Sequence, residues 1–260
     1  MLFPIGDDQV KGGQFPIFSY VFIAINIAVF FFLQIPNEVF TYSYSTVPYE
    51  ITKGVDLVGN IQGVPHYPGP TPIYSTLFTS MFMHGGWMHL IGNMLFLWIF
   101  ADNIESTVGR KRFILFYLLA GLTATLAHVL SAPNSIIPSL GASGAIAGCL
   151  GCYLVMFPKS KIKMLFIIKI FSVPAFLFLL FWIGQQFFSV YLASQNPIQE
   201  SGVAWFAHIG GFLFGVLCGI YFRFYYPKMK HINQQYIPVN RNAYRYNNRQ
   251  ITSHFKNYSD

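Results

Sequence analysis

Six apolar stretches dominate the sequence, and each is long enough, or nearly so, to cross a lipid bilayer as a helix. They cover residues 15–33, 86–100, 113–130, 143–157, 174–192 and 203–222. A helix needs about 20 apolar residues to span the hydrocarbon layer, so the stretch at 143–157 is unusually short. Only 10% of the 260 residues are charged and 54% are hydrophobic, which excludes the charged shell of a water-soluble domain. We therefore expect an all-α membrane protein, built as a bundle of six transmembrane helices.

The positions of lysine and arginine predict how these helices are oriented. If both termini are cytoplasmic, 15 of the 16 basic residues lie on the inner side, and Lys53 alone lies outside. The outer side then receives a long loop over 34–75, whose apolar content indicates that it lies against the membrane. Residues 163–173 alternate basic and apolar side chains and are expected to form an interfacial strip. The predicted order is a cytoplasmic segment, a six-helix membrane domain and a basic cytoplasmic tail, over 1–14, 15–226 and 227–260.

The same sequence disfavours several other kinds of protein. The net charge of +7 comes from basic residues that flank the apolar stretches and form no groove with stacking aromatics, so no nucleic-acid partner is expected. Cys149, Cys152 and Cys218 lie in apolar runs, where packing is expected rather than a disulfide or redox pair. The sequence contains no repeat of helix pairs, which argues against a transporter built on inverted repeats. Residues 1–14 lack the pattern of a cleavable signal.

Polar side chains inside the apolar stretches are the candidates for function, because such groups are costly in a membrane. Ser143 is the first, in the run Gly141-Ala142-Ser143-Gly144 at the start of a short stretch. A helix start has unpaired backbone N–H groups, which can bind the oxyanion of an acyl-transfer reaction at a nucleophilic serine. The alternative is an ordinary N-cap serine in a helix that packs through small residues.

His208 is the second candidate, because it lies on a helix face that is stripped of side chains. Gly211 and Gly215 follow it at i+3 and i+7, and Gly144 and Gly148 form a matching face after Ser143. Two glycine faces allow close approach, which could bring the imidazole and the hydroxyl within hydrogen-bond reach. Such a pair would need a water-filled cavity that opens outwards. The alternative is a histidine that only packs against a neighbouring helix.

His89 and Asn93 share one helix face at i and i+4, and both can donate hydrogen bonds. Near Ser143 they would complete an oxyanion site with the serine's backbone N–H. A metal site with His84 and His89 is the competing interpretation, but the i, i+5 spacing turns the two rings apart and no carboxylate accompanies them. We therefore expect neither a metal nor a cofactor.

No carboxylate is placed to orient His208. Asp102 and Glu105 stand at the inner end of the second stretch, and Glu200 is in the last outer loop. The sequence thus favours a serine–histidine dyad over a triad. His128, in the third stretch, has no evident partner and is expected to pack.

Taken together, these motifs resemble the rhomboid family of intramembrane serine proteases. Gly141-Ala142-Ser143-Gly144 is similar to the family's GxSG box, and Ala207-His208-Ile209-Gly210-Gly211 with Gly215 resembles its AHxxGxxxG box. His84, His89 and Asn93 match HxxxxHxxxN, and Glu105-Ser106-Thr107-Val108-Gly109 is similar to the inner-loop ExxxG. The resemblance covers about 77–222, with four spaced motifs in the expected order.

The resemblance implies a serine endopeptidase that cuts transmembrane proteins near their outer ends. Ser143 would be the nucleophile and His208 the general base, with His89, Asn93 and the Ser143 N–H around the oxyanion. His84, Glu105 and the motif glycines would be structural, and the fifth helix with the loop around 195–201 would form a lateral gate. The alternative is a rhomboid-like protein that binds membrane clients without cutting them. The six-span layout favours a bacterial cytoplasmic membrane, with lipids and transmembrane substrates as partners.

Two departures from the family pattern carry their own expectations. Where members often have Trp-Arg in the first outer loop, this chain has Ser75-Thr76, so that loop must be anchored differently. Where some members place an aromatic residue that stacks on the catalytic histidine, this chain has Ala147. Another residue must therefore position His208.

Overall fold

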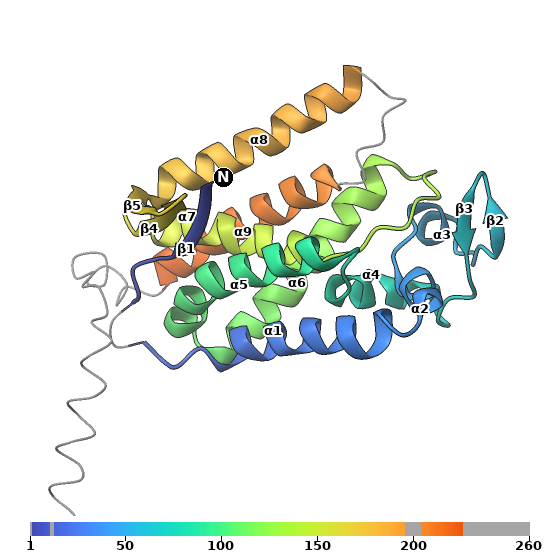
Figure 1. The fold of residues 1–260 in the computed structure, drawn as a ribbon, viewed down its shortest axis with the longest axis horizontal. Helices are drawn as coiled ribbons and strands as arrows, with labels where there is room; N and C mark the ends of the chain where they lie inside the picture. The colour runs from blue at the N-terminus through green and yellow to red at the C-terminus, as the bar shows by residue number, and fades with distance from the viewer. Residues whose placement is uncertain (1, 11–12, 196–203, 226–260) are drawn as a thin grey trace, which may run out of the picture.

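The computed structural model describes residues 2–10, 13–195 and 204–225, which form a helical bundle with two small β-sheets (Figure 1). The long helices are α1 (Ile17–Val29), α5 (Trp87–Val108), α6 (Arg110–Ser131), α7 (Ser143–Met156), α8 (Ala175–Gln195) and α9 (Trp205–Tyr225). A π-helical turn at Phe30–Gln34 continues α1. The long loop over 34–75 contains α2 (Glu38–Tyr44), α3 (Pro48–Lys53), β2 (Gly59–Ile61), β3 (Val64–His66) and a 3₁₀ turn at Ile73–Ser75. Before α5 come α4 (Thr76–Thr79) and a 3₁₀ turn at Ser80–Phe82.

Four helices among the described residues are long and apolar enough to cross a membrane: Ile17–Gln34, α6, α8 and α9. Helix α7 is apolar but has only 14 residues. Helix α5 is long enough, but it contains Asn93, Asp102 and Glu105 and is not one of the four. The count of six spans and the cytoplasmic position of both termini therefore stay predictions. The predicted tail at 227–260 lies outside the described residues.

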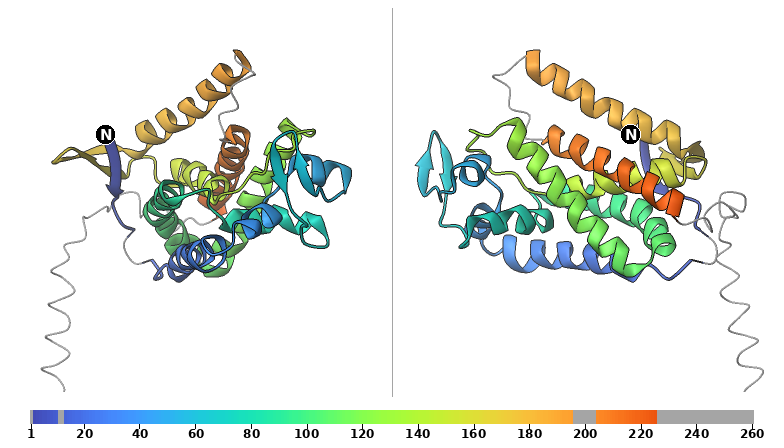
Figure 2. Two further views of the ribbon diagram at one scale, coloured as in Figure 1. Left: turned by 45° about the vertical axis from the view of Figure 1, so that its right-hand side comes forward. Right: turned by 180° about the vertical axis from the view of Figure 1, so that it is seen from behind.

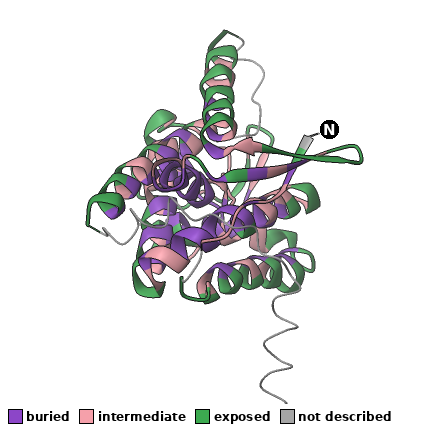
Figure 3. Ribbon diagram, turned by 90° about the vertical axis from the view of Figure 1, so that its left-hand side faces the viewer, coloured by how far each residue is buried: buried purple, intermediate pink, exposed green. Residues whose placement is uncertain are grey.

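The protein is mostly helical, but two small β-sheets depart from the all-α expectation, and the larger one includes a β-hairpin at the strip over 163–173. Strands β4 (Lys161–Phe166) and β5 (Lys169–Pro174) pair antiparallel, and β1 (Leu2–Gly6) pairs with the other edge of β4. Along β4, Ile162 and Met164 are buried, so the basic–apolar alternation has the two-residue period of a strand. The third strand, β1, comes from the N-terminal end of the chain. No local sequence pattern predicts that it pairs with β4. Figure 3 shows the hairpin turn projecting from the protein as an exposed loop.

Helix α7 lies at the centre, packed between α5, α6 and α9, and most of its side chains are buried (Figures 2 and 3). Its contact with α9 is backbone on backbone. A Cβ atom built on Gly215 would lie 1.9 Å from the carbonyl oxygen of Gly148, and one on Gly211 would lie 2.1 Å from that of Gly144. No side chain larger than hydrogen fits at these positions, so the two predicted glycine faces do meet.

Helix α8 is held quite differently. It crosses above the bundle, and its C-terminal half stands away from the other helices in Figures 1 and 2. The side chains that it buries form one narrow stripe, Ala175, Leu179, Ile183 and Gln186. Its first residue is tied down because the Ala175 N–H donates to the Ser160 carbonyl at 2.7 Å. The rest of the helix rests on the bundle through that stripe.

Glu105 joins the C-terminal part of α5 to the N-terminal end of α1. Its carboxylate accepts hydrogen bonds from the backbone N–H groups of Phe18 and Ser19, at 2.9 and 2.7 Å, and from the Ser19 hydroxyl at 2.8 Å. These two N–H groups belong to the first turn of α1, where no intrahelical acceptor exists. A negative charge at the positive end of a helix dipole adds to this stabilisation. Glu105 is fully buried, so its place is inside the scaffold.

Candidate active site

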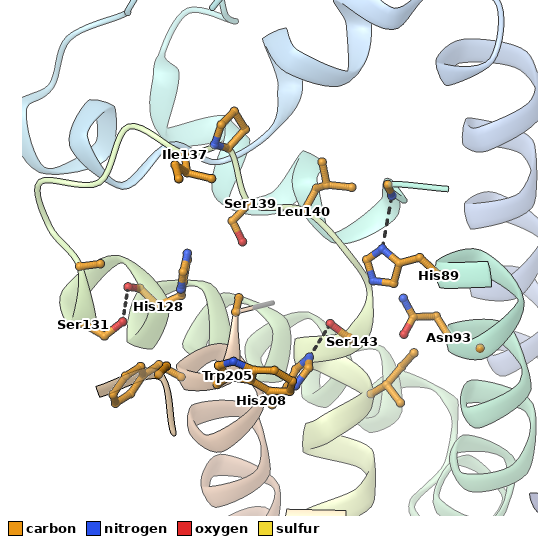
Figure 4. A pocket seen from close by; sticks show the side chains of 18 of the residues that line it. His89, Asn93, His128, Ser131, Ile137, Ser139, Leu140, Ser143, Trp205 and His208 are labelled. Atoms are coloured by element: carbon orange, nitrogen blue, oxygen red, sulfur yellow. Dashed lines mark hydrogen bonds between the residues drawn. The ribbon is translucent and has the colours of Figure 1, made fainter. Parts of the chain in front are cut away.

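Ser143 and His208 meet across the α7–α9 contact, at one end of the central helix (Figure 4). The Ser143 Oγ lies 2.9 Å from the His208 Nε2, within hydrogen-bond distance. Ser143 is the first residue of α7, whereas the N-cap position is held by Ala142 and makes no side-chain cap. The hydroxyl is therefore directed at the imidazole and does not cap its own helix. The alternative of an ordinary N-cap serine is wrong.

His208 also has a second partner, which the sequence analysis missed. Its Nδ1 lies 2.8 Å from the Oε1 of Gln186, a buried residue of α8. The Trp182 ring lies one turn earlier on α8, with its centroid 5.8 Å from that of the imidazole. Ala147 is buried and too small to contact the ring by stacking. Gln186 and Trp182 therefore position the His208 imidazole, which no aromatic residue at 147 can do in this chain.

A signal for Gln186 was present in the sequence. Gln185 and Gln186 are two strongly polar residues inside the fifth apolar stretch, and the rule that selected the histidines applies to them as well. What the sequence did not indicate is which of the two faces inward. The structure buries Gln186 and leaves Gln185 exposed.

His89 faces the same place from α5. Its Nδ1 accepts a hydrogen bond from the Gly85 backbone N–H at 3.3 Å, which leaves the proton of the neutral ring on Nε2. That Nε2 is directed toward Gly141, since a Cβ built there would lie 3.0 Å from it and 3.5 Å from the Ser143 Oγ. His89 thus presents an N–H donor beside the serine.

Asn93 lies one turn further along the same face, and in Figure 4 its amide points toward Ser143. Its Nδ2 is buried and has no hydrogen-bond partner. A buried amide donor without an acceptor is costly, and native proteins retain such groups where a ligand or water completes them. The unpaired donor is therefore available to a charge that develops near Ser143.

The chain just before Ser143 is held by segments that precede α5. Gly141 has φ of +138°, which favours glycine, and its N–H donates to the Ser80 carbonyl at 2.9 Å. Two residues earlier, Ser139 exchanges two backbone hydrogen bonds with Thr46. The Thr46 hydroxyl in turn donates to the carbonyl of Thr76 at 2.8 Å. Hydroxyl and backbone bonds around Thr46 thus anchor the loop where Trp-Arg is missing.

A cavity of about 740 Å³ surrounds these groups, large enough for a peptide segment and water. Ser143, His208, His89 and Asn93 all line it, together with Trp182. His128 lines it as well, from α6. His128 is half-buried, so its ring packs on one side and borders the cavity on another.

His84 stands behind His89, away from the cavity lining. It is almost fully buried, and neither ring nitrogen has a hydrogen-bond partner. The centroids of the two imidazoles lie 5.2 Å apart in an edge-to-face arrangement. Within the described ranges, no three His, Cys, Asp or Glu side chains gather as a metal site would require. A two-histidine metal site thus finds no third protein ligand there.

Comparison with known proteins shows the family to which the sequence is similar. Residues 72–224 match the sequence model of the rhomboid domain family. The chain is 30% identical over 208 residues to yeast "Rhomboid protein 1, mitochondrial", which covers 78% of this chain and 52% of that protein. It is 38% identical over 139 residues to "Rhomboid protease GluP" of Bacillus subtilis, covering 54% of this chain and 24% of that one. Human "Presenilin-associated rhomboid-like protein, mitochondrial" is 29% identical over 154 residues, covering 57% and 38%.

The chain thus spans about half or less of the length of these relatives. Some of them are mitochondrial and one is bacterial, so the comparison does not support a bacterial membrane in particular. The apolar helices and the family together make this an integral membrane protein. The match to the rhomboid domain extends over more than half of the chain and includes both Ser143 and His208. The chain belongs to the rhomboid family.

Proposed function

We propose that the protein is an intramembrane serine endopeptidase that hydrolyses peptide bonds of transmembrane proteins. The observation that carries the proposal is the 2.9 Å contact between the Ser143 hydroxyl and the His208 Nε2 inside a cavity. A serine beside a basic nitrogen is the arrangement by which a weak nucleophile is activated. Membership in a family with a named rhomboid protease adds support.

The proposed reaction begins when His208 Nε2 takes the hydroxyl proton and Ser143 Oγ attacks the peptide carbonyl carbon. The tetrahedral intermediate collapses as the C–N bond breaks, and His208 gives its proton to the leaving amine. Water, deprotonated by the same nitrogen, then attacks the acyl ester and releases the acid product with the serine restored. No step requires a metal or a cofactor.

Three donors converge on the oxyanion in this proposal. They are the backbone N–H of Ser143 at the start of α7, the Nε2–H of His89 and the free amide of Asn93. Donors already held in place cost no reorganisation when the charge develops. We expect Asn93→Ala to lower kcat by about 10²- to 10³-fold, as other oxyanion donors do.

The proposed substrates are membrane-spanning segments that unwind near the outer surface. A peptide carbonyl inside a transmembrane helix is hydrogen-bonded and covered, so cleavage requires local loss of helix. The six-span topology with both termini cytoplasmic and the domain limits at 15–226 belong to the same proposal. The proposed gate is α8 with the loop at 195–201; of that loop, only residue 195 is among the described residues.

The test is labelling by a fluorophosphonate probe in membranes, followed by cleavage of a model single-span substrate. The wild type should be labelled once and should produce a fragment, whereas Ser143→Ala and His208→Ala should do neither. Ser139→Ala is the matched control, because Ser139 lines the same cavity but bonds through its backbone. A Ser143→Ala protein that is still labelled would overturn the nucleophile. A wild type that binds the segment but leaves it intact would favour the client-binding alternative.

A further inference from the structure

The imidazole of His208 has a second side, which faces away from Ser143. Gln186 lies there, in a helix that otherwise buries only Ala175, Leu179 and Ile183 along its inner stripe. It is the polar member of that stripe and is 6% exposed. An amide of this kind is buried in an apolar helix at a cost unless its hydrogen bonds are made.

Both ends of the Gln186 amide have partners of defined chemistry. The Nε2 group donates to the backbone carbonyl of Trp182 at 3.2 Å, one turn back on the same helix. The Oε1 atom then faces the His208 Nδ1 at 2.8 Å. If the amide were flipped, its oxygen would face the Trp182 carbonyl oxygen, and two acceptors would oppose each other. The orientation with Oε1 toward His208 is therefore the one that chemistry allows.

This orientation decides which imidazole nitrogen carries the proton. The amide oxygen can only accept, so the Nδ1 must be the N–H of the neutral ring. The Nε2 is then unprotonated and holds a lone pair 2.9 Å from the Ser143 hydroxyl. In the other tautomer the Nε2 would carry a hydrogen and could not accept the serine proton.

We propose that Gln186 is a positioning residue that holds His208 in the tautomer required of a general base. The inference rests on the proposed function, since the role has meaning only if His208 accepts a proton from Ser143. It extends the predicted dyad to a serine–histidine–glutamine array in which the third member is a neutral amide. Such an amide orients the ring, as the carboxylate of a serine-protease triad does, without burying a negative charge.

Because Gln186 is on α8, the tautomer of His208 depends on whether α8 is docked on the bundle. The bond from Gln186 to His208 joins α8 to α9, and α8 buries only one stripe of side chains against the bundle. When α8 moves outward, the Nδ1 loses its acceptor and the ring loses its fixed tautomer. Chemistry therefore requires α8 to be docked, even if substrate entry displaces it.

The experiment compares Gln186→Met, which keeps the length but lacks the acceptor, with Gln186→Glu, which keeps an acceptor. Gln185→Met is the matched control, because Gln185 is adjacent on the same helix but exposed. We expect Gln186→Met to lower kcat about 10- to 100-fold with little change in KM, and to slow fluorophosphonate labelling of Ser143 similarly. Gln186→Glu should recover most of both rates, and Gln185→Met should match the wild type.

The small probe separates positioning from a merely structural role. If Gln186 only held α8 in place, Gln186→Met would alter KM for the transmembrane substrate or the unfolding temperature and leave the labelling rate unchanged. That result, or a Gln186→Met protein with wild-type kcat, would overturn the inference. Either of these two results for Gln186→Met leaves the proposed function intact, as long as the wild type is labelled and Ser143→Ala is not. A wild type that is neither labelled nor active would instead overturn the proposed function itself.

Discussion

Helices α8 and α9 both contact the imidazole of His208, yet the bundle holds them in opposite ways. Helix α9 is packed backbone to backbone on α7, where added Cβ atoms would lie about 2 Å from carbonyl oxygens. Helix α8 touches the bundle through one stripe, and a Cβ built on its Gly184 would meet nothing within 4 Å. The reacting groups therefore stand on a contact that cannot shift, whereas the group that orients them stands on a helix that can.

The largest expected effect comes from adding a side chain within the backbone contact between α7 and α9. In Gly215→Ala the new methyl group would lie 1.9 Å from the Gly148 carbonyl oxygen, a backbone atom that moves only if α7 moves. Overpacking of this kind costs about 1–3 kcal/mol and occasionally more, and we expect the upper end here. Thermal unfolding in mild detergent should show a lower midpoint, and activity should fall because the 2.9 Å serine–histidine contact opens. An unchanged midpoint would show that α7 and α9 are not in rigid contact.

The close α7–α9 contact is also the part of the site that the sequence could predict. Glycines at fixed spacing around Ser143 and His208 define two bare faces, and bare faces have few ways to pack other than on each other. Such spacing is local information, which a single chain displays. The same reasoning placed His89 and Asn93 on one face of α5.

The part that sequence reasoning missed depends on contacts between distant segments. Gln186 becomes a partner of His208 only through the rotation of α8, which its polar neighbour Gln185 left ambiguous. The hairpin at 161–174 was missed because its third strand comes from Leu2–Gly6. The place of His128 in the cavity lining depends on which face of α6 is turned toward the cavity. None of these follows from hydrophobic periodicity.

An intermediate effect is expected at Asp7, which follows strand β1 and bonds to the central helices. Asp7 accepts hydrogen bonds from Tyr153 of α7 and from Asn103 of α5, the latter at 2.6 Å. Burial raises the pKa of Asp7 well above its usual value, and the nearby Asp102 carboxylate raises it further. The folded protein thus binds the Asp7 proton more tightly than the unfolded chain does.

The stability contributed by Asp7 is therefore complete below its unfolded pKa near 3.8 and is lost as the pH rises toward the raised value. Over that window the slope approaches about 1.4 kcal/mol per pH unit. Hydrogen exchange of β1 and β4, corrected for the intrinsic rate, should show less protection at higher pH. Asp7→Asn should reduce this dependence, because the amide cannot ionise, and the buried Asp102 should account for the slope that remains. A slope in Asp7→Asn as steep as that of the wild type would assign the titration to another group.

The smallest effect is expected at Gly184, the counterpart of Gly215 on the loosely held helix. A methyl group there enters open space, so Gly184→Ala should create no steric conflict. Alanine is the better helix former by about 0.5–1 kcal/mol, so the unfolding midpoint should stay the same or rise slightly. Activity should stay within about twofold of the wild type, because the substitution leaves the stripe with Gln186 in place. If Gly184→Ala instead destabilised the protein as much as Gly215→Ala, α8 would have to pack tightly along a second face. The contrast between a fixed α9 and a movable α8 would then fail, and with it the reason for expecting the tautomer of His208 to depend on the position of α8.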